Sequence, residues 1–300
     1  MTTQFRILIL GHGEMGQAME YLLSDRQQLD IWEKYPHDNF PSVVLEQAAP
    51  LADIVLFCLP VNPHQEIVKH IAPLLKQTCL CVSIAKGLDE AGQTAAQIFA
   101  DGLASHQAYA LLYGPMISEE IRAGRYAFAQ LGCTDTDSFN KIRALFHATH
   151  LYIEQTSDIT GISWSVILKN VYAILFGVAD ELQLGDNMRG YLSVAALREL
   201  DQIVRTMGGQ AASPYHLAGL GDLITTATSE DSHHHELGRM LAREETRGIK
   251  GEGVHTLEMV SQHHLFNPAD YPLFKLIHDI VRQPHDVGKK INEYLTQVFS

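Results

Sequence analysis

The first half of the chain alternates short apolar runs with segments of helical periodicity. Residues 5–10 (FRILIL) form a nearly continuous apolar run, which predicts a buried strand. The next segment is apolar at positions 15, 18, 19, 22 and 23, the spacing of an amphipathic helix. Further strands are expected at residues 29–32, 54–59, 79–85, 108–113, 126–131 and 151–154, with another helix around 67–75. This alternation predicts an α/β fold, a doubly wound, mostly parallel sheet with helices on both faces.

The pattern changes after about residue 156. Residues 160–182 are apolar nearly all round, which predicts a helix buried on most sides. Helical periodicity continues at 191–207, 234–243, 256–263 and 272–281, and no β-rich run follows. We therefore expect a Rossmann dinucleotide-binding domain over residues 1–157 and an all-α substrate and catalytic domain over residues 158–300.

Composition narrows the class of protein. The 300 residues are 46% hydrophobic and 19% charged, as in ordinary globular proteins of two domains. Lysine and arginine number 22 against 35 acidic residues, a net charge of −13 without any basic run, which argues against a nucleic-acid partner. The four cysteines form no CxxC pair, and the longest apolar run, residues 171–179, is too short to cross a bilayer. We expect a cytoplasmic protein without membrane insertion.

A glycine-rich turn follows the first predicted strand. Residues 11–16 read Gly-His-Gly-Glu-Met-Gly, a GxGxxG motif that opens a helix. Gly11 allows the tight turn, Gly13 lets the backbone approach a diphosphate, and Gly16 permits close packing of helix on strand. The backbone of Glu14 and Met15 begins the helix, whose N-terminus attracts phosphate.

The end of the second predicted strand carries Glu33. It lies twenty residues after Gly13, where a carboxylate accepts hydrogen bonds from the ribose hydroxyls of NAD. The neighbouring Lys34 is suited to a 2′-phosphate instead. The expected cofactor is therefore NAD, with NADP as the alternative.

Lys169 is the exceptional residue of the long apolar segment. Its helical neighbours Ser165, Ala173 and Gly177 are all small, which we interpret as room for a ligand. A lysine is rarely buried unless it is paired or functional, although it can also extend to the surface. Asn170 follows it and is suited to bind a substrate hydroxyl or the cofactor amide.

Two further polar points stand in glycine-rich settings. Lys86 ends the fourth predicted strand, at the edge where parallel sheets bind ligands, although a solvated strand end is the simpler interpretation. Asp222 ends a Gly-Leu-Gly-Asp element, either as a turn residue or as a partner for a lysine, and a hydroxyl-rich stretch, residues 223–232, follows before a helix. Together these parts suit carbonyl reduction by hydride transfer.

These motifs resemble the bacterial type of NAD(P)-dependent glycerol-3-phosphate dehydrogenase over nearly the whole chain. The matching elements are residues 11–16, 85–88, 114–115 with Glu120, 168–171, Asn187 and Arg189, 219–223 and 252–253. The family interconverts dihydroxyacetone phosphate and sn-glycerol 3-phosphate, so the resemblance implies a small phosphorylated substrate, with a homodimer left open.

The resemblance also implies roles for individual residues. Lys169 would give or take the proton at the substrate oxygen, with Lys86 and Asp222 beside the substrate and Asn170 close to them. Gly114 would lie against the substrate phosphate or the cofactor. Glu252 would contact the cofactor from the second domain.

The chain departs from the family at its phosphate-binding element. Ser232, His233 and His234 stand where the family has Ser-Arg-Asn, and Met116 replaces a serine or threonine. The region between Lys34 and residue 53 is also shorter. No metal is expected at the run of three histidines, since consecutive helical residues point about 100° apart. Two alternatives stay open: the same chemistry on another small keto or hydroxy acid, and a non-catalytic NAD-binding regulator.

Overall fold

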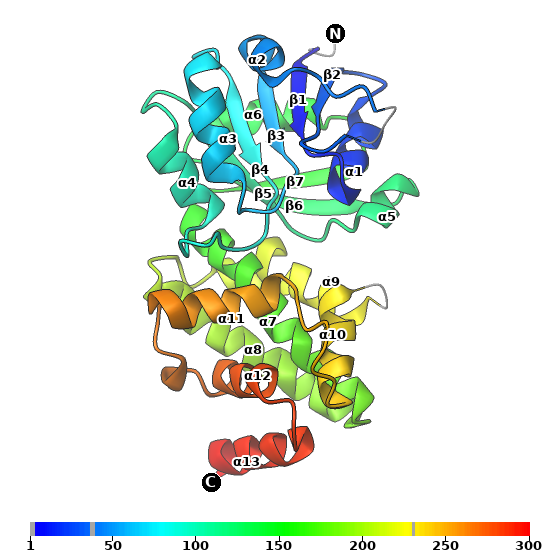
Figure 1. Ribbon diagram of the computed structural model, residues 1–300, viewed down its shortest axis with the longest axis vertical. Helices are drawn as coiled ribbons and strands as arrows, with labels where there is room; N and C mark the ends of the chain where they lie inside the picture. Colours follow the sequence, from blue (N-terminus) through cyan, green and yellow to red (C-terminus); the bar gives the residue numbers. More distant parts are fainter. Residues whose placement is uncertain (1–3, 37–39, 230–231) are drawn as a thin grey trace. The chain divides into compact units, whose positions relative to one another are not determined.

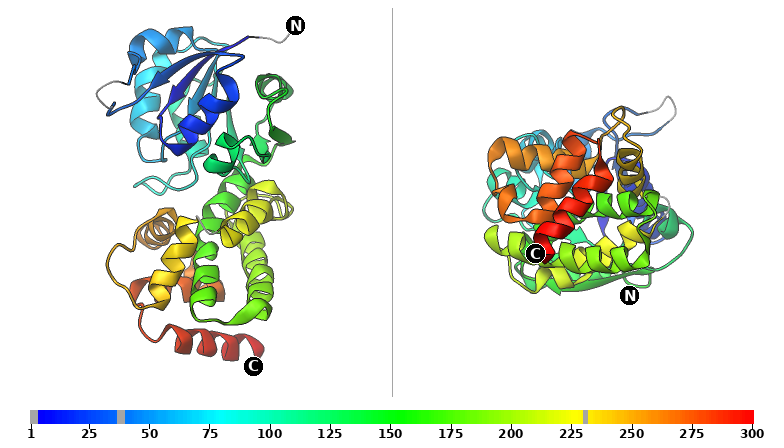
Figure 2. Two further views of the ribbon diagram at one scale, coloured as in Figure 1. Left: turned by 90° about the vertical axis from the view of Figure 1, so that its right-hand side faces the viewer. Right: turned by 90° about the horizontal axis from the view of Figure 1, so that it is seen from below.

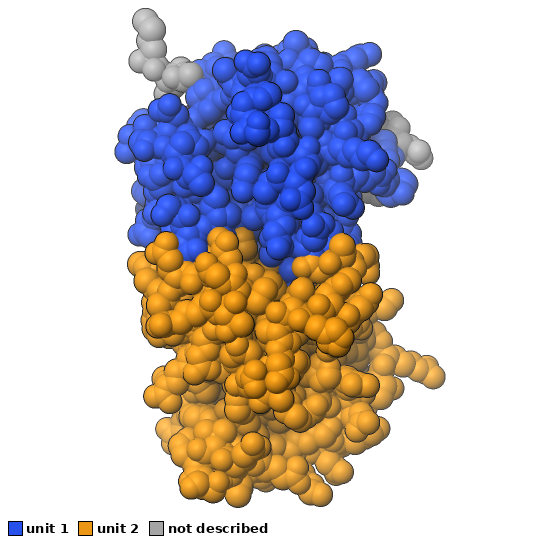
Figure 3. Space-filling model, turned by 90° about the vertical axis from the view of Figure 1, so that its left-hand side faces the viewer, with its two compact units in different colours: residues 1–89, 93–159 blue, residues 90–92, 160–300 orange. Residues whose placement is uncertain are grey.

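The computed structural model describes residues 4–36, 40–229 and 232–300, and it divides the chain into two compact units (Figure 3). The first unit comprises residues 1–89 and 93–159, and the second comprises residues 90–92 and 160–300. The units part at residue 159, two residues beyond the expected boundary. The grouping of residues 90–92 with the second unit was not indicated by any sequence pattern.

The described part of the first unit is built on a seven-stranded sheet in the order β2-β1-β3-β4-β5-β6-β7 (Figure 1). Its strands are β1 Arg6–Leu10, β2 Gln28–Trp32, β3 Ile54–Phe57, β4 Leu80–Ser83, β5 Tyr109–Tyr113, β6 Ala127–Gly132 and β7 Leu151–Thr156. Every neighbouring pair is parallel except β5 and β6. The central strands β3 and β4 are buried at every residue, which explains their uninterrupted apolar sequences.

Helices pack on this sheet through their apolar faces. They are α1 Glu14–Leu23, α2 Leu45–Ala48, α3 His64–Ile71, α4 Ala95–Gly102, α5 Ser118–Arg122 and α6 Thr136–Leu145. Thr94 and Gln97 form a capping box that begins α4, and the Asp135 side chain caps α6. The predicted doubly wound architecture is thus confirmed.

The second unit is helical and is organised around α7, Ile159–Glu181 (Figures 1 and 2). By length and composition α7 could cross a membrane, but its most apolar window is entirely buried inside the protein. The other α-helices of the described residues are α8 Gly185–Thr206, α9 Asp222–Thr228, α10 His233–Ala242, α11 Glu252–His263, α12 Pro272–Arg282 and α13 Val287–Phe299. The prediction of an all-α second half is confirmed.

Gly177, one of the three small residues beside Lys169, serves helix packing, which corrects the sequence interpretation at that position. A Cβ atom added to Gly177 would lie 1.9 Å from the His235 carbonyl oxygen, and one added to Gly238 would lie 2.0 Å from the Ile174 oxygen. Helices α7 and α10 therefore cross at backbone contact. Ser165 is also engaged internally, because its hydroxyl donates to the Gly161 carbonyl oxygen at 2.7 Å.

The hydroxyl-rich stretch after Asp222 begins as a helix rather than as a loop. Residues 222–228 form α9, and Thr225, Thr226 and Thr228 each donate a hydroxyl hydrogen bond to the carbonyl one turn earlier. Residues 230 and 231 of the predicted stretch lie outside the described residues. Two further differences concern helices. Helix α13 was not predicted, and α8 begins at Gly185, six residues before the expected start at residue 191.

Candidate functional site

The glycine-rich turn of the first unit has the backbone that its motif predicts. Gly11 has a φ of +92°, a conformation that favours glycine, and it joins β1 to α1. A Cβ atom on Gly16 would lie 2.1 Å from the Gly11 carbonyl oxygen, whereas one on Gly13 would meet no heavy atom within 4 Å among the described residues. The turn is therefore tight on its inner side and open at Gly13, the position from which a backbone can approach a diphosphate.

Glu33 is tied to this turn. One carboxylate oxygen accepts the His12 backbone N–H at 2.7 Å, and the other accepts the Lys34 N–H at 3.1 Å. The two bonds fix the carboxylate at the end of β2 while each oxygen keeps a further lone pair. A ribose hydroxyl can therefore still be bound there.

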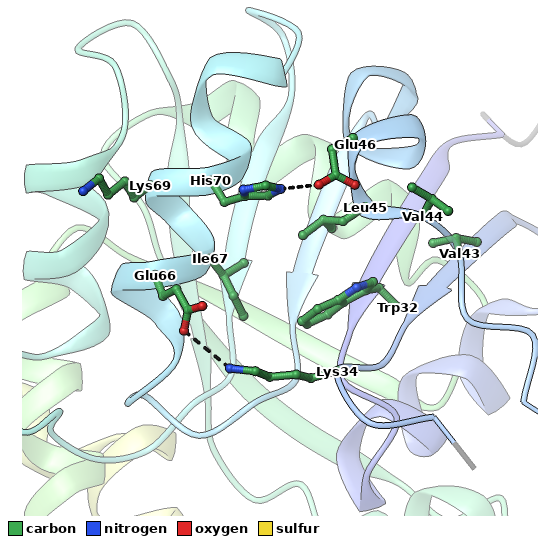
Figure 4. A pocket seen from close by; sticks show the side chains of 10 residues that line it. All are labelled: Trp32, Lys34, Val43, Val44, Leu45, Glu46, Glu66, Ile67, Lys69 and His70. Atoms are coloured by element: carbon green, nitrogen blue, oxygen red, sulfur yellow. Dashed lines mark hydrogen bonds and ion pairs between the residues drawn. The ribbon is translucent and has the colours of Figure 1, made fainter. Parts of the chain in front are cut away.

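A cavity of about 590 Å³ is lined by Trp32 and Lys34, the chain neighbours of Glu33 (Figure 4). Trp32 from β2 and Ile67 from α3 form apolar walls, and Lys34 spans its edge with the ammonium 3.4 Å from a Glu66 carboxylate oxygen. On the opposite side His70 contacts Glu46 at 2.7 Å. The cavity combines an aromatic wall and a polar rim, which are properties of small-ligand sites.

Lys86 and Gly114, both predicted as ligand contacts, lie together in the first unit. The Lys86 ammonium donates to the Gly114 carbonyl oxygen at 3.3 Å. Gly114 has a φ of +156°, and a Cβ there would lie 2.5 Å from the Phe128 carbonyl oxygen. Met116 is buried in the core of the unit, so this position cannot supply the hydroxyl that the family has.

A buried histidine contacts the end of β4, three residues before Lys86. His64 is fully buried and bonds the Pro60 carbonyl at 2.9 Å through Nδ1 and the Ser83 hydroxyl at 2.9 Å through Nε2. Since a carbonyl only accepts, Nδ1 carries the proton and Nε2 accepts from Ser83. Burial lowers the pKa of His64 to about 4, so the ring is neutral near neutral pH.

The second unit buries a charged pair on its central helix. The Lys169 ammonium lies 2.6 Å from the Thr226 hydroxyl and 3.3 Å from an Asp222 carboxylate oxygen. The side chains of Lys169 and Asp222 are only 7% and 4% exposed. Lysine and aspartate are thus brought together as their motifs suggested. Thr226 was missed, and only the register of the unexpected α9 would have placed it one turn after Asp222.

Asn170 presents an unsatisfied acceptor next to this pair. Its amide nitrogen donates to a Glu252 carboxylate oxygen at 2.8 Å, while its buried Oδ1 has no hydrogen-bond partner within the described residues. Buried polar oxygens are rarely left unpaired in folded proteins. The amide oxygen therefore indicates a position for a ligand donor.

The three consecutive histidines diverge along α10. His233 donates through Nε2 to the Lys250 carbonyl oxygen at 2.8 Å, and His234 Nε2 accepts the Gly253 N–H at 3.3 Å. His235 instead contacts Asp180 at 2.7 Å. Ser232 caps α10 through its hydroxyl. Within the described ranges, no group of three or more metal-ligating side chains is found.

The fold and these sites define a class of protein. A parallel sheet with a GxGxxG turn between β1 and α1, joined to a helical unit with a buried lysine, is typical of two-domain, nicotinamide-dinucleotide-dependent dehydrogenases. Family models for the N-terminal and C-terminal parts of NAD-dependent glycerol-3-phosphate dehydrogenase match residues 34–139 and 158–292. The chain belongs to this family of NAD(P)-dependent oxidoreductases.

Individual relatives agree with the family models. The glycerol-3-phosphate dehydrogenase (NAD(P)+) of Nitratidesulfovibrio vulgaris strain DP4 is 27% identical over 324 residues, covering 97% of this chain and 98% of its own. A relative of the same name from Mycobacterium bovis is 33% identical over 65% of this chain and 57% of its own.

Solved structures show the same fold. The glycerol-3-phosphate dehydrogenase of Coxiella burnetii superposes with a TM-score of 0.82 at 23% identity, over 97% of this chain and 99% of its own. A ketopantoate reductase from Ralstonia eutropha is more distant, with a TM-score of 0.56 at 15% identity over 92% and 97% of the two chains.

Proposed function

We propose that this protein interconverts dihydroxyacetone phosphate and sn-glycerol 3-phosphate, and that Lys169 exchanges the proton at the substrate oxygen. The observation that carries the proposal is the buried Lys169–Asp222–Thr226 cluster on an otherwise apolar helix. An ammonium that lies next to a carboxylate and a hydroxyl can donate a hydrogen bond to a carbonyl oxygen as that oxygen gains negative charge. The relatives' names supply the substrate.

The residues around the glycine-rich turn fit a dinucleotide. The open backbone at Gly13 and the first turn of α1, with Glu14, Met15 and Gly16, would hold the diphosphate, and Glu33 would hold the adenosine ribose. The cavity walled by Trp32 suits the adenine ring. When bound, the nicotinamide supplies or accepts the hydride.

The chain's own side chains account for the proton. During reduction, Lys169 donates a proton to the carbonyl oxygen that becomes the alcohol, and it takes the proton back in the reverse direction. Asp222 and Thr226 hold the ammonium in place, since each contacts it directly. The unpaired Oδ1 of Asn170 accepts from a hydroxyl of the substrate or from the cofactor amide, and Glu252 keeps the Asn170 side chain oriented.

The phosphate of the substrate is assigned to the remaining polar groups that the resemblance indicated. Ser232, His233 and His234 are the proposed contacts of the phosphate. Lys86 is proposed, on the same resemblance, to lie beside the substrate, and Gly114 to lie against the substrate phosphate or the cofactor. The imidazole of His233 stands where the family has a permanently charged guanidinium, which predicts a lower affinity for the phosphate than an arginine gives. The second candidate function is reduction of another keto acid, which the replaced Ser-Arg-Asn element favours.

Replacement of Lys169 tests the reaction. Lys169→Met is expected to lower turnover with dihydroxyacetone phosphate and NADH by at least roughly 10²-fold, the contribution of a proton-transfer group. Because the change leaves Asp222 buried without its cation, the double variant Lys169→Met/Asp222→Asn is measured as well. Lys275→Met, which removes an exposed lysine of α12, is the matched control and should keep full activity. Near-wild-type turnover in a folded Lys169→Met preparation would contradict the proposal.

Cofactor choice gives an independent test. NADH is expected to bind at least about tenfold more tightly than NADPH, since Glu33 repels a 2′-phosphate and Lys34 is paired with Glu66. Trp32 lines the cavity, so quenching of its fluorescence in a Trp164→Phe background reports binding directly. Tighter NADPH binding would mean that Lys34 binds the 2′-phosphate of the ribose.

We further propose a cytoplasmic location for the protein. Analytical centrifugation would decide between a monomer and a homodimer.

A further inference from the structure

Glu14 places a negative charge at the phosphate-binding end of α1. It is the first residue of the helix, its side chain is 63% exposed, and it lies inside the GxGxxG turn. In the free protein, a carboxylate at this position stabilises the helix through its favourable interaction with the helix dipole. The same carboxylate would repel a diphosphate that approaches the same backbone N–H groups.

Helix α5, which carries Arg122, packs beside α1 (Figure 1). One terminal nitrogen of its guanidinium contacts the Glu14 carboxylate, and the other donates to the Gln17 side-chain oxygen at 3.0 Å. Gln17 in turn donates to the His12 carbonyl oxygen at 3.2 Å, which ties the guanidinium to the turn itself.

The Arg122 guanidinium does not use all of its hydrogen-bond donors within the described residues. Its Nε is buried and has no hydrogen-bond partner in the part of the chain that the structure describes. The side chain as a whole is 34% exposed, so the charge is held in a partly desolvated position where screening by water is reduced.

We propose that Arg122 is a positioning residue for cofactor affinity, which neutralises Glu14 and draws it towards α5 so that the diphosphate meets only the helix N-terminus. The inference rests on the proposed dinucleotide binding. Its consequence is that the loss of Arg122 matters only while Glu14 is charged. A guanidinium that contacted the diphosphate directly would matter in either case.

A double-mutant cycle on NADH binding tests the proposal. Arg122→Met is expected to raise the Kd for NADH about tenfold, while Glu14→Gln lowers it about threefold, since each change alters one unit charge near the diphosphate. The double variant Glu14→Gln/Arg122→Met should bind within about threefold of Glu14→Gln. A double variant that stays as weak as Arg122→Met would overturn the proposal, because Arg122 would then act without Glu14.

Two further measurements separate this effect from a loss of structure. ADP-ribose should show the same pattern as NADH, whereas adenosine, which lacks the diphosphate, should bind all four proteins equally. Arg125→Met is the matched control, because it removes a charge from the neighbouring exposed pair with Glu120, and it should leave the Kd for NADH unchanged. If the wild-type protein binds neither NADH nor NADPH, the proposed function fails. If it binds NADH and Arg122→Met binds equally well, only the present inference fails.

Discussion

The two units build their candidate sites in different ways. The first unit uses backbone geometry within a few consecutive residues, so Gly11, Gly13 and Gly16 form the turn almost alone. The second unit assembles side chains from distant segments: Lys169 meets Thr226 from 57 residues away, and Asn170 meets Glu252 from 82 residues away. A site of the first kind follows from local sequence, whereas a site of the second kind depends on how helices pack.

The crossing of α7 and α10 is an exception to this contrast, because the second unit also relies on glycine backbone there. Gly177→Ala is expected to destabilise the protein by about 3 kcal/mol, because the new Cβ would lie 1.9 Å from a carbonyl oxygen of α10. Gly190→Ala in α8 is the matched control: its Cβ would meet no described atom within 4 Å, so helix propensity should make it neutral or slightly stabilising. Urea unfolding of both variants decides the matter. Equal midpoints would mean that α10 can move away from α7 at little cost.

The same contrast explains what the sequence could and could not predict. The GxGxxG turn, the parallel sheet and the buried long helix follow from local spacing and periodicity. The role of Gly177 did not, because a small residue on a helix face indicates either a ligand or a neighbouring backbone, and only the position of α10 distinguishes the two. Thr226 and Arg122 were missed for a related reason, because each acts on a partner in another element. Thr226 lies in the hydroxyl-rich stretch, but the sequence does not indicate which of its hydroxyls meets Lys169, and Arg122 lies in no motif.

Buried titratable side chains extend the comparison of the two units to the pH dependence of their stability. Each unit contains a titratable side chain whose charged form is disfavoured by burial. In the first unit, burial lowers the pKa of His64 from 6.5 to about 4. Between these values the unfolded chain binds more protons than the folded one, so stability is lost as the pH falls from 6.5 towards 4. The shift corresponds to a loss of about 3 kcal/mol at most. Urea titrations followed by Trp32 emission in a Trp164→Phe background should show it, and His64→Gln should flatten the slope. An unchanged slope in His64→Gln would show that other groups dominate acid unfolding of this unit.

Glu199 of α8 is the counterpart in the second unit, and its expected effect is smaller and of opposite sign. Desolvation raises its pKa, but its carboxylate accepts the Leu273 and Phe274 backbone N–H groups at 2.6 and 2.8 Å and the Tyr172 hydroxyl at 2.9 Å, and these bonds offset part of the shift. Because the folded state now binds the proton more tightly than the unfolded chain, stability should fall as the pH rises from about 4.5 through the raised pKa.

The two opposing slopes can be separated because the chain has two tryptophans, one in each unit. Trp164 lies on α7 and packs against Phe266, so its emission in a Trp32→Phe background reports unfolding of the second unit. The urea midpoint of that unit should decline gently from pH 4.5 upwards, and Glu199→Gln should abolish the decline while His64→Gln leaves it unchanged. If His64→Gln alters the Trp164 transition as strongly as the Trp32 transition, the units unfold together, and stability does not distinguish them even though their sites are built differently.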